Sequence, residues 1–192
     1  MEQGFSFGRG TDLGLTLIVV VALTTPIALT WMLANLLNNK HVLEKAVVKE
    51  TLGLYPPGPA TIPHEAVEDS YIASYHIPKG TRVLANLRKL HRDPSIWLNP
   101  DKFMPEIFLT EETGGVAVLG QHFELIPFGS GRRSCPGITF ALQVLHLALA
   151  RILQGFSITT QMNKPVDKAE GLGITLVKAT PLEAQILPCN IL

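Results

Sequence analysis

The sequence predicts a mainly α-helical fold with small β-sheets, of the α+β class, and three observations support this prediction. Two long apolar segments, 13–37 and 138–156, have the length and spacing of helices, and 41–54 continues the helical pattern. Residues 60–86 alternate short extended runs with turns, which favours a small sheet. The 192 residues are 46% hydrophobic, which is enough for one domain with a core.

The first predicted helix, 13–37, contains no charged residue. Its length and hydropathy suit a transmembrane helix, but threonines and the central Pro26 interrupt it, so a buried helix explains it as well. No basic start and no small-residue cleavage site mark it as a signal peptide. The preceding residues, 1–12, are glycine-rich, and we expect them to be disordered.

Turn residues divide the rest of the chain. The prolines of 55–59 end the second helix, because a proline biases the residue before it away from helix. Residues 99–127 have little regular pattern and predict a meandering loop. The runs 174–177 and 184–187 are strand-like, and a Thr-Pro pair between them predicts a closing hairpin.

The most informative stretch is 128–137, FGSGRRSCPG, which places Cys135 in a glycine-rich turn just before a long apolar helix. Pro136 suits the first turn of that helix, where its missing N–H costs nothing. Cys135 then lies at the helix N-terminus, where the dipole and free N–H groups favour the thiolate. A thiolate in such a position suits a ligand to haem iron, in which it favours O–O cleavage.

The neighbours of Cys135 suit a haem as well. Arg133 offers a forked donor to a carboxylate such as a haem propionate. Gly131 and Gly137 let the backbone approach a flat macrocycle, and Phe128 can pack on it. A cysteine simply buried in a glycine-rich turn is the alternative interpretation.

Charge and cysteine content argue against other classes of protein. Sixteen basic and 16 acidic residues leave a net charge of +0, without the basic surplus of a nucleic-acid-binding protein. Two cysteines, Cys135 and Cys189, are too few for a disulfide framework. No Cys-x-x-Cys or paired-histidine spacing predicts zinc, and we expect most of the six histidines to be surface or packing residues.

The stretch 128–137 fits the pattern Phe-x-x-Gly-x-Arg-x-Cys-x-Gly, and here the chain resembles the cytochrome P450 family. From about 17 to 187 it looks closest to the plant A-type cytochromes P450, in particular the family numbered eighty-two. The resemblance implies a partial cytochrome P450 fold over 13–192, with haem as cofactor and Cys135 as the iron ligand. Supporting runs are 29–31 (LTW), 36–39 (LLNN), 55–59 (YPPGP), 63–65 (PHE), 90–94 (LHRDP) and 120–137.

The resemblance also implies a function, namely monooxygenation of a small lipophilic plant metabolite. Electrons would come from an NADPH-dependent reductase, at the endoplasmic reticulum membrane. A whole family member is far longer, and the likeness begins at the helix that crosses the oxygen side of the haem. A further segment is missing between 44–46 and 47–50, as though an exon had been skipped. We therefore expect an incomplete substrate pocket and weak or no activity of this chain alone.

Several site residues are implied by the same resemblance. Thr24 lies at the oxygen site, but Leu23 stands where the family has an acid that helps to deliver protons. Valines at 20–21 replace small residues of the family. His64 lies where a histidine or arginine usually meets a haem propionate, although a surface histidine explains it as well. Residues 172–174 would line the remaining pocket.

Two arginines expected by the resemblance are absent. The family has Glu-x-x-Arg on one helix face, and here the motif runs from Glu50 to Gly53. A second arginine, from a Pro-Glu-Arg-Phe-like loop, is replaced by Ile107. Glu50 thereby loses its partners, and a buried carboxylate without partners is costly or becomes protonated. We expect a looser scaffold behind the Cys135 turn.

Two other classes of function remain open. A non-enzymatic remnant, such as a pseudogene or splice product, would expose the apolar faces of 13–37 and 138–156, and such faces tend to associate. Alternatively, 13–37 could span a bilayer in a small membrane-attached protein, although the flanking basic residues give a weak orientation signal.

Overall fold

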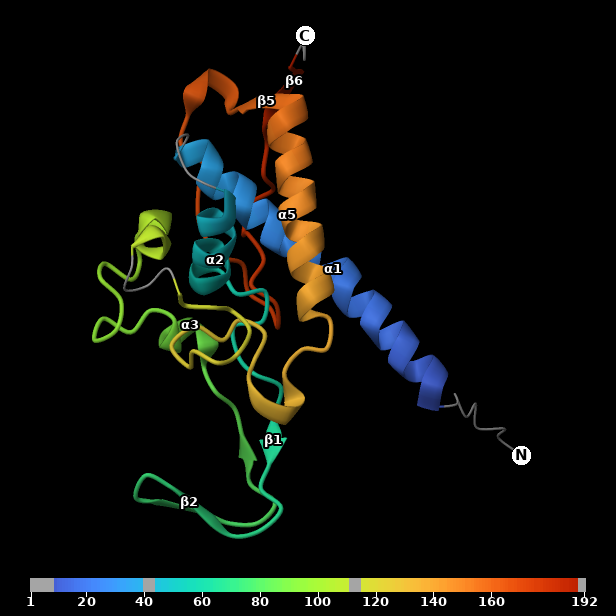
Figure 1. Cartoon of the computed structure of the whole chain (residues 1–192), viewed down its shortest axis with the longest axis vertical. Helices are drawn as coiled ribbons and strands as arrows, with labels where there is room; N and C mark the ends of the chain where they lie inside the picture. The colour runs from blue at the N-terminus through green and yellow to red at the C-terminus, as the bar shows by residue number, and fades with distance from the viewer. Residues whose placement is uncertain (1–8, 40–43, 111–114, 190–192) are drawn as a thin grey trace.

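The computed structural model describes residues 9–39, 44–110 and 115–189, and this part is mainly helical with small sheets, as predicted (Figure 1). Helices of the 3-10 type are labelled η. The elements are α1 (Arg9–Asn38), α2 (Glu44–Leu54), β1 (His64–Glu65), β2 (Ser70–Ile72), β3 (Tyr75–Ile77), β4 (Arg82–Val83), α3 (Leu87–Leu90), η1 (Pro105–Leu109), η2 (Gly131–Arg133), α5 (Ile138–Gly155), β5 (Phe156–Thr159), η3 (Gln161–Asn163) and β6 (Gln185–Pro188).

The core lies where α1, α2 and α5 pack against one another (Figure 1). Each helix contributes apolar side chains at helical spacing, which places them on one face. Phe128, from the turn before α5, is half-buried against this cluster and thereby ties the turn to the three helices. The buried members, each at most 2% exposed, are Ala28, Met32, Val47, Val48, Leu52, Leu145 and Leu149.

Helix α1 starts earlier than predicted, at Arg9. The predicted disorder of 1–12 is therefore wrong for 9–12, while 1–8 lie outside the described residues. An existing helix extends at little cost, and 9–12 contain no proline to stop it. The helix also continues through Pro26, where the side chain of Thr30 donates to the carbonyl of Pro26 at 2.8 Å. Ala22 and Pro26 are exposed, so water can satisfy the carbonyl that the proline leaves without a donor.

The small sheets consist of antiparallel strand pairs. Within 60–86, β1 pairs with β4 and β2 pairs with β3, which confirms the strands predicted there. The β2–β3 hairpin projects from the end of the molecule opposite the C-terminus (Figure 1).

The predicted C-terminal hairpin is wrong. Strand β6 pairs with β5, which continues directly from α5, and places Ile158 opposite Ile186. The run 174–177 forms no strand in the structure. The β5–β6 pair lines a half-open apolar cavity of about 370 Å³ together with the ends of α1 and α5. All four residues of β6 are exposed, so its pairing with β5 depends on backbone hydrogen bonds between the strands and not on burial of its side chains.

Large apolar side chains remain exposed on the outer face of α5. Phe140 is 57% exposed and Leu147 is 62% exposed, as predicted for a chain whose helices lack further cover. Within the described residues, α5 is also the helix with the length and composition to cross a membrane, at a mean hydropathy of 1.4 over 18 residues. A core helix meets the same criteria, and Leu145 and Leu149 of α5 are fully buried in the protein.

Candidate functional site

The turn that carries Cys135 is held by its own backbone. The N–H of Cys135 donates to the carbonyl of Phe128 at 2.9 Å, and the N–H of Ser134 donates to that of Gly131 at 3.1 Å. Gly131 has φ +70°, a left-handed conformation that favours glycine. Cys135 is a free, half-buried thiol. A Cβ added to Gly137 would lie 3.9 Å from its Sγ, at ordinary van der Waals distance, so this glycine lies beside the sulfur.

The predicted position of Pro136 needs a small correction. Helix α5 begins at Ile138 with Gly137 as its cap, so Pro136 lies in the preceding turn and not in the first helical turn. Gly137 has φ −90° and ψ 8°, and the chain becomes helical only after it. Cys135 therefore lies two residues before the cap, still beside the N-terminal end of α5.

Gly120 packs closely against the Cys135 turn, a contact that the sequence did not reveal. A Cβ at Gly120 would come within 2.9 Å of the carbonyl oxygen of Gly129, so a side chain here would push against the turn. The hydroxyl of Ser130 also donates to the carbonyl of Gly120 at 2.7 Å. The glycine is visible in the sequence, but the reason for it is not. A side chain is excluded because a segment ten residues further along the chain packs closely against Gly120.

The structure brings Phe128, Gly131, Arg133, Cys135 and Gly137 together in one turn, with the side chain of Arg133 exposed.

The other predicted site residues come from separate elements. Thr24 is half-buried on α1, one turn before the core residue Ala28 and therefore on the same helix face. Leu23 is 56% exposed. His64 is exposed on β1, where it pairs with Val83. The side chains at 20–21 lie outside the described part.

The segment 172–174 does not form a pocket wall by itself. Leu172 and Ile174 are 103% and 95% exposed, so their side chains contact almost nothing in the described chain.

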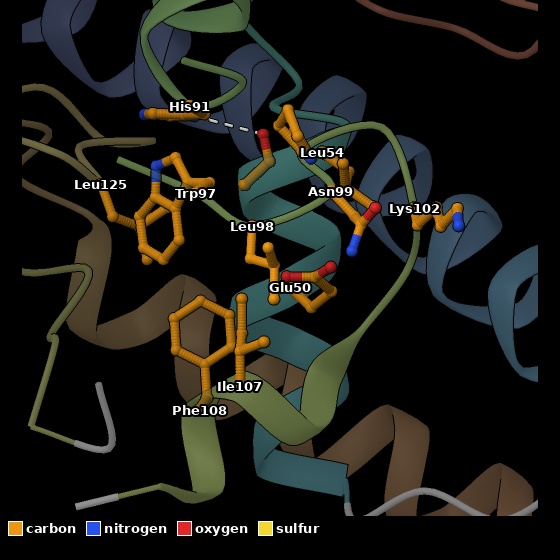
Figure 2. A pocket seen from close by; sticks show the side chains of 12 residues that line it. Glu50, Leu54, His91, Trp97, Leu98, Asn99, Lys102, Ile107, Phe108 and Leu125 are labelled. Carbon is orange, nitrogen blue, oxygen red and sulfur yellow. Dashed lines mark hydrogen bonds between the residues drawn. The ribbon is translucent and has the colours of Figure 1, made fainter. Parts of the chain in front are cut away.

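The carboxylate of Glu50 lies on α2, and Figure 2 shows it among the side chains that line a pocket. Glu50 is 6% exposed, and one of its oxygens accepts the N–H of Met104 at 2.8 Å. It borders a cavity of about 20 Å³, room for a single water molecule. Gly53 and Ile107, the two positions where the family resemblance expects arginines, border the same cavity. The positions converge as predicted, but neither offers a positive charge.

The environment of Glu50 favours its neutral form. Burial raises the pKa of Glu50 to about 7, and the negative charge of Glu106 acts in the same direction. The N–H of Met104 and the charge of Lys168 act against this rise without cancelling it. The predicted tendency of this carboxylate to become protonated is confirmed.

His91 was expected to be an ordinary surface or packing residue, and the structure gives it a more specific place. It is 4% exposed at the end of α3, with Nδ1 3.3 Å from the carbonyl oxygen of Gly53. Its Nε2 accepts the N–H of Ile126 at 3.0 Å. Burial lowers the pKa of His91 to about 4, so the ring is neutral near pH 7. No local pattern marks this role, because both partners are more than 30 residues away.

Replacing Gly53 with alanine is expected to raise the free energy of unfolding by about 0.5–1 kcal/mol, because glycine inside a helix is less stable than alanine by about that amount. The new Cβ would lie 3.2 Å from Cδ1 of Leu125. That atom is the flexible end of a side chain that borders the cavity and can shift into it. Urea denaturation of both chains measures the difference, and a loss of stability would mean that Leu125 cannot move.

Comparison with known proteins places this geometry in context. A family model described as Cytochrome P450 matches residues 43–186. Vinorine hydroxylase of Rauvolfia serpentina is 59% identical over 150 residues, covering 78% of this chain and 31% of that protein. Nicotine N-demethylase CYP82E3 of Nicotiana tomentosiformis is 44% identical over 215 residues, covering 96% of this chain and 41% of that protein.

Solved structures agree with the sequence relatives. A zebrafish cytochrome P450 determined with abiraterone has a TM-score of 0.74 and 28% identity, covering 87% of this chain and 45% of that chain. The chain thus spans less than half the length of each of these proteins. The 215 residues aligned with the nicotine N-demethylase also exceed the 192 of this chain, so that relative has internal residues without a counterpart here. This agrees with the missing internal segment.

Proposed function

Because the chain belongs to the cytochrome P450 family, we propose that it is the haem-thiolate part of a monooxygenase that oxidises a small lipophilic plant metabolite with molecular oxygen. The observation that carries the proposal is the Cys135 turn, in which a free thiol lies beside the start of a core helix. The named relatives act on plant compounds such as vinorine and nicotine, and this supports the substrate class.

The residues of the turn fit a haem. Cys135 is half-buried and unpaired, as an iron ligand must be before it binds, and the small Gly137 lies beside its sulfur. When bound, haem would supply oxygen activation, which a thiolate ligand favours. The exposed guanidinium of Arg133 would bind a propionate, and His64 would bind another. Phe128, with its ring half-buried, would pack on the macrocycle together with the backbone at Gly131.

On the oxygen side, Thr24 would hold a hydrogen bond over the reacting centre. Its neighbour Leu23 has no proton to give and points an exposed apolar side chain outward. Proton delivery beside Thr24 would therefore depend on water, which predicts slower turnover than in relatives with an acid at this position.

Electron supply and location follow the same proposal. An NADPH-dependent reductase would deliver electrons, and the complete protein would work at the endoplasmic reticulum membrane. The plant relatives of the family support this assignment.

A second candidate is a chain that keeps the Cys135 turn without activity of its own. The exposed faces of α5 and of 172–174, and the carboxylate of Glu50 without a basic partner at Gly53 or Ile107, favour it. A third, a small membrane-attached protein, depends on 13–37, and release of the chain by carbonate extraction would argue against it.

The test is the absorption spectrum of the reduced, carbon-monoxide-bound chain after expression with added haem. A red-shifted Soret band is expected for the wild type, and Cys135→Ser should abolish it because an alcohol does not replace a thiolate ligand. Cys189→Ser is the matched control, since this exposed cysteine lies after β6 and should leave the band unchanged. If the wild type takes up no haem, or shows no thiolate band, the second candidate is correct.

A further inference from the structure

We infer that His91 is a positioning residue that holds the Cys135 turn against the end of α2. It does so through two hydrogen bonds, one at each ring nitrogen: Nδ1 donates and Nε2 accepts. The inference deepens the proposed function, on which its catalytic meaning rests, but the contacts exist in the chain without any cofactor.

The first hydrogen bond joins His91 to α2. The last carbonyls of a helix have no partner within it, and the Gly53 carbonyl belongs to the last turn of α2. Nδ1 of His91 lies 3.3 Å from this oxygen, as the dashed line in Figure 2 shows. Because a carbonyl oxygen can only accept, Nδ1 carries the proton and donates it.

The second hydrogen bond joins His91 to the segment before the cysteine. Ile126 is buried, and its N–H donates to Nε2 of His91 at 3.0 Å. The two partners assign the same tautomer, with a proton on Nδ1 and a lone pair on Nε2. Phenylalanine would keep an aromatic ring at this position but would leave a buried N–H and a buried carbonyl unpaired, which is unfavourable.

From Ile126 the connection reaches the backbone of Cys135 through two further hydrogen bonds, which the peptide bond between Phe128 and Gly129 joins. The carbonyl of Ile126 accepts the N–H of Gly129, and the carbonyl of Phe128 accepts the N–H of Cys135, both at 2.9 Å. A chain of hydrogen bonds thus runs from α2, through the imidazole, to the residue that carries the thiol. His91 also borders the small cavity that Gly53 and Ile107 line, so neither of those positions supplies a longer polar side chain beside the ring.

The ring must stay neutral to play this part, since a proton on Nε2 would face the N–H of Ile126. Burial, with a smaller contribution from the charge of Arg92, favours the neutral ring, while the bond to Gly53 acts against it. The two hydrogen bonds of His91 are therefore expected to persist near pH 7, where the ring is neutral.

The test measures order at Cys135 in the cofactor-free chain. The alkylation rate of Cys135 is compared with that of the exposed Cys189, which serves as an internal reference in each sample. For His91→Phe, the rate at Cys135 relative to Cys189 is expected to rise about tenfold or more, because the turn opens locally. Leu149→Ala is the matched control, since it destabilises the core of three helices but removes neither hydrogen bond of His91. Equal relative rates in both variants would overturn the inference.

A pair of conservative variants separates the two ring nitrogens. The amide of His91→Gln reaches the position of Nε2 and can accept from Ile126, whereas that of His91→Asn reaches only the position of Nδ1 and can bond Gly53. We expect Gln to keep Cys135 slow to alkylate and Asn to lose this protection, and the opposite order would overturn the inference. These readouts need no haem, so a wild type without a thiolate band would defeat the proposed function and leave this result standing.

Discussion

Replacing Trp31 with alanine is expected to lower the free energy of unfolding by about 3–5 kcal/mol, the usual range when a large buried aromatic side chain is removed. Trp31 is 0% exposed, and its ring stacks on Tyr55 with centroids 3.9 Å apart. Its Nε1–H donates to the carbonyl of Leu176 at 2.8 Å. One side chain on α1 therefore joins the end of α2 to the loop before β6. Urea denaturation at pH 7 measures the change.

Trp31→Phe separates packing from the hydrogen bond. Phenylalanine can keep a stack on Tyr55 but leaves the buried carbonyl of Leu176 without its donor, so it should lose about 1–3 kcal/mol. If the free energy of unfolding of Trp31→Ala fell by less than about 1 kcal/mol, the result would contradict the stabilising contact of Trp31 with the end of α2 and the loop before β6.

Replacing Glu50 with glutamine is expected to stabilise the chain at pH 8 by up to about 3 kcal/mol and to change little at pH 4. The pKa of Glu50 is about 7 in the folded chain, against an ordinary value of 4.5. Between these values the folded state keeps a proton that the unfolded state has lost, so stability falls as the pH rises and stays low above pH 7. Glutamine removes this loss and can still accept the N–H of Met104.

As the pH rises, the titration of His91 changes the stability of the fold in the opposite direction to that of Glu50, and this provides a second check on the Glu50 prediction. Its pKa is about 4 in the folded chain, against an ordinary value of 6.5, so its contribution falls as the pH drops through this range. In the wild type the two residues oppose each other between about pH 4.5 and 6.5, and stability should be nearly flat there. In Glu50→Gln it should rise with pH by about 1.4 kcal/mol per unit. Denaturation curves at half-unit steps would show both, and a flat profile in the variant would contradict the assignment.

Much of the fold could be predicted because its signals are local. The helix after Cys135 ends at Gly155 as its apolar spacing indicates, and prolines end α2 just after Leu54. The strand pairing at the C-terminus was predicted wrongly, because β6 pairs with β5, a strand far earlier in the sequence, and not with a run joined to it by a turn.

The candidate site divides in the same way. The thiol, its glycines and its arginine lie within ten residues, so a short pattern was enough to find them. That the positions of Gly53 and Ile107 meet at Glu50 was implied by the family resemblance, and the structure adds that they border one small cavity between α2 and η1. His91 was overlooked, since a histidine beside an arginine in a turn has no distinctive spacing.

By itself, the sequence determined the helices, the turn that carries Cys135 and the family to which the chain belongs, because spacing, glycine and proline act within a few residues. Only the tertiary structure decided which strand pairs with β6, that burial raises the pKa of Glu50, and that one imidazole joins Gly53 to Ile126. These features depend on burial and on hydrogen bonds between residues far apart in the sequence, and such contacts leave no periodic trace along a chain.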